Sequence, residues 1–322
     1  MNAPVLVLLE HDRGEVSETT FQAIACDRSF GNVHAVLIGT EADAAVAELG
    51  SYGVEKVWLV HHDALRDYAP EAWGDALAQL AQAVGTTGVM STGTDRGNEV
   101  MAHVAAVLEL PLATNVLSAE TNGSAVSLTR SRWGGSLIER ASISAPVLLL
   151  TTAMHAYPGE PMGNATTPTT EVFVPTLDDD LAGRTRIVDR VTLAAGITLT
   201  TAPVVVSGGR GVGSPEGFAM LEELAGLLGG AVGCSRVVTN NGWRPHSDQV
   251  GQTGKRVAPE LYIACGISGA IQHWVGMMAA KKVLAINTDK DANMVSKADY
   301  AVIGDLHEVL PALVAELRSR RV

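Results

Sequence analysis

The stretch PVVVSGGRGVGS, residues 203–214, decides how the second half of the chain folds. Three valines before a glycine cluster are typical of a buried strand that ends in a tight turn. Ser214 and Pro215 then favour the start of a helix, which Gly229 and Gly230 end. A strand, a glycine turn and a helix in this order predict one unit of a parallel α/β sheet.

The same pattern continues toward the C-terminus. Apolar runs at 260–266, 282–287 and 300–305 predict further strands, and 306–318 predicts a closing helix. The carboxyl ends of parallel strands meet at one edge of the sheet, where open α/β sheets bind their ligands. Glycine or polar residues follow each predicted strand, so the sequence predicts a ligand site at that edge.

The first half of the chain also alternates. Strands are predicted at 5–10, 34–39, 56–62, 88–93 and 171–177, and helices at 18–26, 41–49, 71–84 and 95–110. Residues 124–152 read as consecutive strands with turns at Asn122-Gly123 and Gly134-Gly135, which predicts an antiparallel extension of this sheet. A loop is predicted at 155–170, and the acidic triplet 178–180 reads as a solvated loop in a connection that runs to about residue 201. The fold class is therefore α/β with two domains, residues 1–195 and 196–322.

Composition and charge exclude several classes of protein. The net charge of −12 argues against nucleic acid as a partner. No apolar run approaches the ~20 residues that a membrane helix needs, and the N-terminus reads as a strand, so direct membrane insertion is not expected. The three cysteines are far apart in sequence, which argues against a disulfide scaffold, a metal site or an iron–sulfur cluster and favours a cytoplasmic location.

The net negative charge comes from the part of the chain before residue 203. Residues 203–322 hold 12 Lys and Arg against 11 Asp and Glu, whereas the rest holds 11 against 24. The C-terminal domain thus keeps cations that an anionic ligand could use, although a more acidic solvated surface on the other domain explains the same numbers.

Individually, the glycine motifs leave alternatives open. Gly209 and Gly211 fit a dinucleotide fingerprint, but Ser214 occupies its third glycine position, so a structural turn remains open. Arg210 favours a phosphate loop, because a cation in such a turn needs an anion or solvent. The turn GISGAIQH, 266–273, opens a predicted helix at 274–280 and could also bind a pyrophosphate, whereas His273 by itself is compatible with a core or capping histidine. The stretch DQVGQTG, 248–254, is predicted to be a loop.

Taken together, these motifs resemble the alpha subunit of electron transfer flavoproteins. The resemblance is dense over about 203–310, in VVVSGGRGVGS, VGQTGK, GISGAIQH, AIN, ADY and VIGDL, and weaker over the N-terminal domain. It implies a nucleotide-hydrolase-like (HUP-type) N-terminal α/β domain and a Rossmann-like C-terminal domain that binds FAD. It also implies a heterodimer with a beta subunit, which carries electrons from flavin dehydrogenases, such as acyl-CoA dehydrogenases, to a membrane quinone oxidoreductase.

The resemblance further implies which residues contact FAD. Arg210 lies at the phosphate end, Arg236 is the cation over the ring, and Thr253 offers its hydroxyl towards N5. The complete predicted set is Arg210, Ser235, Arg236, Val250, Gly251, Gln252, Thr253, Ser268, Gly269, Ala270, Ile271, Gln272, His273, Asn287, Asp305 and Leu306, with no catalytic residue and no metal ligand.

Other functions compete with an electron carrier. The glycine turn also suits an NAD-binding regulatory or deacylase-like α/β protein, and a flavin enzyme with its own organic substrate would use a similar domain. Within the resembled family, the alpha subunit of an electron-bifurcating complex is a further alternative.

Overall fold

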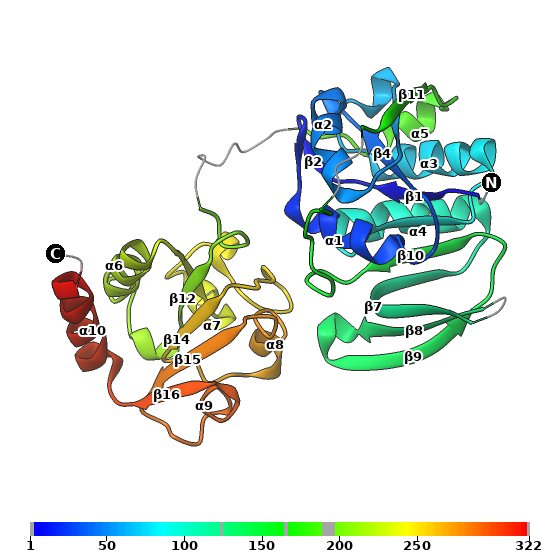
Figure 1. The fold of residues 1–322 in the computed structure, drawn as a ribbon. Coiled ribbons are helices and arrows are strands. Elements are labelled where there is room, and N and C mark those ends of the chain that lie inside the picture. Colours follow the sequence, from blue (N-terminus) through cyan, green and yellow to red (C-terminus); the bar gives the residue numbers. More distant parts are fainter. Residues whose placement is uncertain (1–2, 123–124, 164–166, 189–196, 321–322) are drawn as a thin grey trace. The chain divides into compact units, whose positions relative to one another are not determined.

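The computed structural model describes residues 3–122, 125–163, 167–188 and 197–320. These residues form two compact units, each an α/β structure with its own sheet (Figure 1). The predicted two-domain α/β class is thus confirmed. The predicted boundary between 195 and 196 lies outside the described residues.

A nine-stranded mixed sheet forms the N-terminal unit, in the order β11-β5-β4-β1-β6-β10-β7-β8-β9. Its strands are β1 (Val5–Leu8), β4 (Val33–Ile38), β5 (Lys56–Val60), β6 (Gly88–Thr92), β7 (Leu112–Asn122), β8 (Ala125–Arg132), β9 (Leu137–Ile143), β10 (Leu148–Thr152) and β11 (Thr169–Phe173). A separate two-stranded ribbon pairs β2 (His11–Asp12) with β3 (Glu15–Val16). The pairings from β11 to β7 are parallel, and β7, β8 and β9 are antiparallel.

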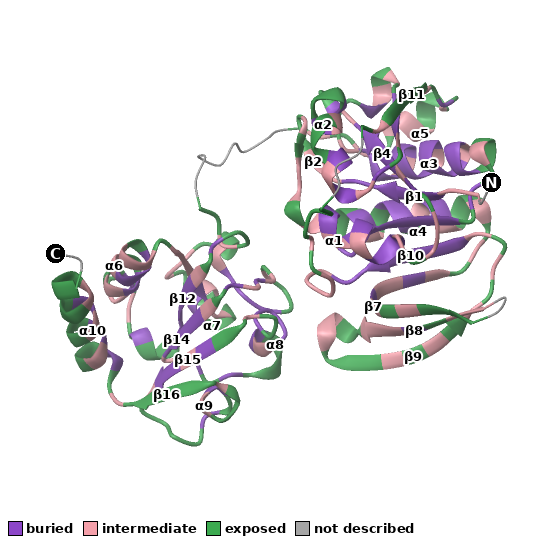
Figure 2. Cartoon of the chain, viewed as in Figure 1, coloured by how far each residue is buried: buried purple, intermediate pink, exposed green. Residues whose placement is uncertain are grey.

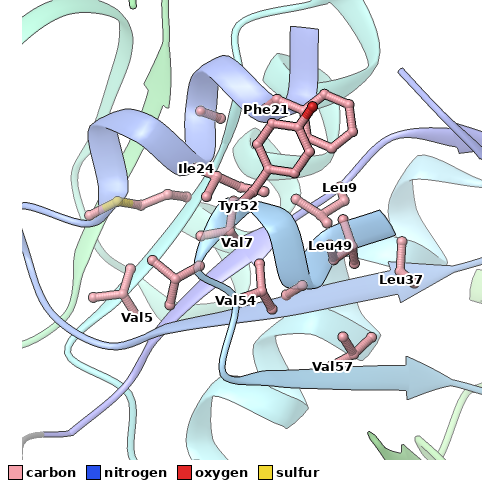
Figure 3. Close-up of a cluster of buried hydrophobic side chains, with 14 of the residues drawn as sticks. Val5, Val7, Leu9, Phe21, Ile24, Leu37, Leu49, Tyr52, Val54 and Val57 are labelled. Carbon is pink, nitrogen blue, oxygen red and sulfur yellow. The ribbon is translucent and has the colours of Figure 1, made fainter. Parts of the chain in front are cut away.

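Helices cover both faces of this sheet. They are α1 (Glu18–Asp27), α2 (Val46–Leu49), α3 (Pro70–Val84), α4 (Asp95–Leu108) and α5 (Asp179–Gly183), with 3-10 helices η1 (Ala42–Ala45), η2 (Gly50–Tyr52), η3 (Asp63–Leu65) and η4 (Trp133–Gly135). On one face, Phe21 and Ile24 of α1 pack on Val5 and Val7 of β1, and the ring of Phe21 stacks on that of Tyr52 (Figure 3). The apolar residues of α3 and α4 cover the other face. The central strands β1, β6 and β10 are accordingly buried on both sides, whereas β8, β9 and β11 are largely intermediate or exposed (Figure 2).

Two predictions for the N-terminal unit were wrong in part. Strand β10 does not belong to the antiparallel extension, because it lies between β6 and β7 and is parallel to both. Its five residues are all buried, as expected for a central parallel strand covered on both faces. The acidic triplet 178–180 is not a plain loop, since the Asp178 carboxylate accepts a hydrogen bond from the amide of Asp180 and caps α5.

A five-stranded, fully parallel sheet forms the C-terminal unit, in the order β13-β12-β14-β15-β16. Its strands are β12 (Val204–Gly208), β13 (Ala231–Cys234), β14 (Leu261–Cys265), β15 (Lys282–Asn287) and β16 (Tyr300–Ile303). Its helices are α6 (Phe218–Leu228), α7 (Arg236–Asn240), α8 (Ile271–Trp274), α9 (Asn293–Lys297) and α10 (Leu306–Arg320), with η5 (Arg210–Val212) and η6 (His246–Asp248). Helices α6 and α10 cover one face, where Phe218 and Leu221 are fully buried. Each such side chain contributes about 1.5–3 kcal/mol to stability.

Two helices of this unit begin at residues other than those predicted, and three short elements were not predicted. Helix α6 begins at Phe218 and not at Pro215, although the Ser214 hydroxyl does accept a hydrogen bond from the amide of Gly217. Helix α8 begins at Ile271 and has four residues, so the helix predicted at 274–280 was wrong in position. Strand β13 and helices α7 and α9 were missed, because elements of four or five residues are too short to show a period.

No helix in the part of the chain that the structure describes combines the length and apolar character needed to cross a membrane.

The closest backbone approach near the ends of β12 and β14 is testable at Gly266, which has φ of 63° and packs against Gly211. A Cβ there would lie 2.7 Å from the Gly211 Cα. We therefore expect Gly266→Ala to lower the free energy of unfolding by about 2–4 kcal/mol in urea titrations followed by circular dichroism. The matched control is Gly226→Ala in α6, where a Cβ meets nothing within 4 Å and should stabilise the protein by up to about 1 kcal/mol. Equal effects of the two changes would contradict the tight contact.

Candidate functional site

A cleft of about 700 Å³ opens at the carboxyl edge of the five-stranded sheet. Pockets of this size accept ligands as large as a dinucleotide. Most of the residues predicted as ligand contacts line it, namely Arg210, Ser235, Arg236, Val250, Gly251, Gln252, Thr253, Ser268, Ala270, Gln272, His273 and Asn287. Their side by side placement follows from the parallel topology, which brings the ends of β12, β13, β14 and β15 to one edge.

The floor of the cleft is built from two glycine turns that hold each other. The amide of Gly209 donates to the Cys265 carbonyl over 2.9 Å, and the amide of Gly211 donates to the Gly266 carbonyl over 3.1 Å. A Cβ on Gly209 would lie 2.3 Å from the Gly266 oxygen. Because only glycine permits this approach, the turn that carries Arg210 and the turn that follows β14 lie together at the edge of the sheet.

The loop 248–254 forms one wall. Its backbone is held on two sides, because the amide of Val250 donates to the Cys234 carbonyl and the amide of Gln252 donates to the Gln272 carbonyl, over 2.9 and 2.7 Å. Gly251 has φ of 145° and packs so closely on Gly276 that a Cβ on Gly276 would lie 2.3 Å from the amide nitrogen of Gly251. The loop is therefore a fixed part of the site.

Two cations in the cleft have no acidic partner. Among the residues that the structure describes, no carboxylate forms an ion pair with Arg210 or Arg236, and both side chains belong to exposed residues. Arg244, in contrast, pairs with both Glu222 and Asp248. A guanidinium without a carboxylate beside a cleft is suited to an anionic ligand.

Backbone donors lie in the same cleft. In the described part of the chain, no hydrogen-bond acceptor is found for the amides of Ser268 and Ala270, which follow β14 and line the cleft. Asn287 is fixed, since its amide group donates to the Ile267 carbonyl over 3.0 Å and accepts from the amide of Asp289 over 3.0 Å. Unpaired amides together with Arg210 could bind phosphate oxygens.

His273 is the buried polar side chain of the site, at 7% exposure. Its Nε2 lies 2.9 Å from the hydroxyl of the fully buried Tyr262. Burial lowers the pKa of His273 to about 4, and the nearby carbonyl of Val250 acts more weakly in the opposite direction. Its Nδ1 is buried without a hydrogen-bond partner among the described residues. Burial therefore keeps the ring neutral, and the side chain is held against Tyr262 at the edge of the cleft.

Four predicted contacts do not line the cleft. Gly269 packs on the backbone of Met294, and Ile271 is exposed. Asp305 caps α10 by accepting a hydrogen bond from the amide of His307, and Leu306 is buried in the core. As ligand contacts, these four remain predictions.

Sequence reasoning missed several lining residues, namely Gly209, Gly211, Val237, Asn240, Gln249, Gly266, Ile267, Asp289 and Ala292. The sequence predicts Gly209, Gly211 and Gly266 as turn residues, and their conformational freedom was the signal that could have marked them as lining residues. Val237 and Asn240 lie on α7, which the sequence did not predict, and Gln249 gave no signal because its role depends on side chains that meet only in the folded unit.

The fold and the cleft define a two-domain α/β protein that binds an anionic nucleotide cofactor. The size of the cleft, and the cations and amides for which the described residues provide no partner, fit a flavin dinucleotide. Comparison with known proteins agrees with this description. The model of the electron transfer flavoprotein domain matches residues 5–177, and that of the electron transfer flavoprotein FAD-binding domain matches residues 198–278.

Relatives of similar length support the same assignment. The chain is 34% identical to the electron transfer flavoprotein subunit alpha of Bacillus subtilis, over 100% of this chain and 99% of the relative. It is 38% identical to that of Mycobacterium tuberculosis over 99% of each chain, and 39% identical to that of Paracoccus denitrificans over 97% of this chain and 99% of the relative. The chain belongs to the alpha subunits of the electron transfer flavoprotein family. FAD is therefore the cofactor of its C-terminal unit.

The lowered pKa of His273 makes stability depend on pH. Below a pKa of 6.5 the unfolded chain binds a proton at this ring that the folded chain takes up only near pH 4, so acid favours unfolding. We expect the free energy of unfolding of the native chain to fall by up to about 3 kcal/mol relative to His273→Gln as the pH drops from about 6.5 to 4. Urea titrations of both proteins across this range measure the difference, because other titrating groups are common to both. Parallel curves would show that the buried ring does not control this stability.

Proposed function

We propose that the chain pairs with a beta subunit, that the pair holds one FAD, and that it carries electrons from flavin dehydrogenases to a membrane quinone oxidoreductase. One observation carries the proposal: the cleft places two cations, Arg210 and Arg236, around a space large enough for a dinucleotide, and no described carboxylate forms an ion pair with either of them. The names of the relatives as alpha subunits support the heterodimer. In this account the chain is an electron carrier and not an enzyme with its own substrate.

Bound FAD supplies a ring that accepts and releases electrons. The protein holds and tunes it. Arg210 and the amides of Ser268 and Ala270 would bind the phosphates, and Arg236, Thr253 and His273 would surround the ring. The guanidinium of Arg236 is a cation beside the cleft, so it favours the reduced, more negative state of the cofactor.

The distribution of charge supports a division of labour between the two units. Residues 203–322 are nearly neutral, with 12 basic and 11 acidic side chains, and the rest of the chain is strongly acidic. We assign cofactor binding to the C-terminal unit and docking on the beta subunit to the N-terminal unit. An acidic surface beside the docking face would keep the complex soluble.

The heterodimer is tested by co-expression with a beta subunit of this family. We expect the purified pair to be yellow and to contain one FAD per pair, measured by absorbance and by release of the flavin after denaturation. The alpha chain alone should retain less FAD if the partner completes the site. A colourless pair, or a pair that never forms, would refute the proposed function.

The role of Arg236 is tested by its removal in the same complex. We expect Arg236→Ala to lower the first one-electron midpoint potential of the bound flavin by about 10–40 mV, because an exposed charge interaction contributes about 0.2–1 kcal/mol. The matched control is Arg256→Ala, which removes an equal charge from a residue outside the lining of the cleft. Spectroelectrochemical titration measures both variants, and identical shifts would mean that only net charge matters.

A further inference from the structure

Gln249 is a buried polar residue that the proposed function leaves without a role. It is 2% exposed and lies between α7 and the loop 250–253 of the cleft. The backbone of Gln249 is fixed by two hydrogen bonds. Its backbone N–H donates to the His246 carbonyl over 3.0 Å, and its backbone carbonyl accepts from the N–H of Lys255 over 2.6 Å. Gly254 allows the loop to curl over it, since a Cβ on Gly254 would lie 2.2 Å from the Gln249 carbonyl oxygen.

The side chain of Gln249 connects two threonine hydroxyls. Its Oε1 accepts from the Thr239 hydroxyl over 2.7 Å, and its Nε2 donates to the Thr253 hydroxyl over 2.9 Å. The shorter distance is typical of an O–H···O bond and the longer one of an N–H···O bond, so the two lengths agree with this orientation of the amide.

This orientation determines what Thr253 can do. A threonine hydroxyl has one proton, and because the oxygen of Thr253 already accepts from Gln249, the proton remains available for another partner. Thr253 lines the cleft. We propose that Gln249 is a positioning residue that commits the proton of the Thr253 hydroxyl to the cleft, so that Thr253 acts as a donor toward the bound cofactor. The inference rests on the proposed function and deepens it.

The consequence for the flavin is electrostatic. A donor aimed at the ring stabilises electron density that is added on reduction, whereas an oxygen lone pair aimed at the same place opposes it. The amide of Gln249 would thus contribute to the reduction potential through the direction of the Thr253 hydroxyl. With the amide reversed, Thr253 would donate to Gln249 and present only lone pairs to the cleft.

Thr239 meets Gln249 from the far side, and its single proton has two acceptors within reach, Oε1 of Gln249 and the Arg236 carbonyl. The proposed orientation has this proton donated to Oε1, the nearer of the two. The Thr239 hydroxyl is 2.9 Å from the Arg236 carbonyl, and Thr239 itself is not among the residues that line the cleft. While the Thr239 proton is shared with Oε1, the amide oxygen of Gln249 is held away from Thr253. Replacing Thr239 therefore perturbs the orientation of the Gln249 amide without changing any charge and at a residue that does not line the cleft.

The test is a double-mutant cycle in the FAD-loaded complex with the beta subunit. Gln249→Glu keeps the shape of the side chain but offers only acceptors, so Thr253 must donate to it and not into the cleft. We expect about a tenfold lower ratio of reduced to oxidised flavin at a fixed solution potential, which is about 30 mV for two electrons. In the Thr253→Val background this part of the shift should vanish, because no hydroxyl remains to be turned.

The charge of the introduced carboxylate acts in both backgrounds. The difference between the shifts in the two backgrounds therefore measures the part of the shift that depends on the Thr253 hydroxyl. Equal shifts in both backgrounds would overturn the proposal, and they are also the outcome expected if the amide has the reverse orientation.

Thr239→Val provides a second measurement that does not depend on whether Gln249→Glu folds. It adds no charge and should lower the same ratio by a smaller factor, again only when Thr253 keeps its hydroxyl. A shift of equal size in the Thr253→Val background would show an effect on packing alone and overturn the proposal. Failure of the native complex to bind FAD would instead refute the proposed function, so the two failures are distinguishable.

Discussion

The C-terminal unit depends on the contact between two glycine turns at the ends of β12 and β14. The hydrogen bond from Gly211 to Gly266 is possible only where no Cβ lies between the two backbones. This contact holds Arg210 and the amides that follow Gly266 at one edge of the sheet. A side chain at either turn would separate them, and the cations and backbone donors of the cleft would no longer face the same ligand.

The rest of the cleft depends on this floor in a definite order. Helix α8, which follows the turn after β14, supplies the Gln272 carbonyl that holds the loop 248–254, and the loop encloses Gln249 and presents Thr253. His273 lies in the same helix and is kept neutral by burial next to Tyr262. The backbone of the cleft is therefore held in place by the glycine turns and the loop 248–254. The positive charges lie on its solvent-exposed side, since Arg210 and Arg236 are exposed residues. Such an arrangement can hold a cofactor firmly and still leave its potential sensitive to nearby groups.

Most of the fold could be predicted from the sequence, because long elements carry a clear period. Helices α3 and α4 and strands β5 and β6 were predicted within a few residues, whereas a strand at β7 was not predicted. The errors have physical causes. A continuous apolar run such as 148–152 fits either an extension or a central strand, and only its neighbours, β6 and β7, decide between them. Helices as short as α7 are stabilised by packing and leave no pattern of their own.

For the site, the sequence by itself determined the residue types that any ligand would meet: glycine turns, two cations, and a loop with Gln252 and Thr253. It also indicated that the stretches after the predicted strands lie at one edge of a sheet, because parallel strands joined by helices all end at the same edge. The order of the strands, and the placement of Arg236 after β13, came from the structure. Only the tertiary structure decided that Arg244 pairs with two carboxylates while no carboxylate in the described ranges pairs with Arg236, and that Gln249 links Thr239 to Thr253. Pairing and hydrogen-bond direction depend on distances of a few ångströms between segments far apart in the chain, and such distances exist only after the chain has packed.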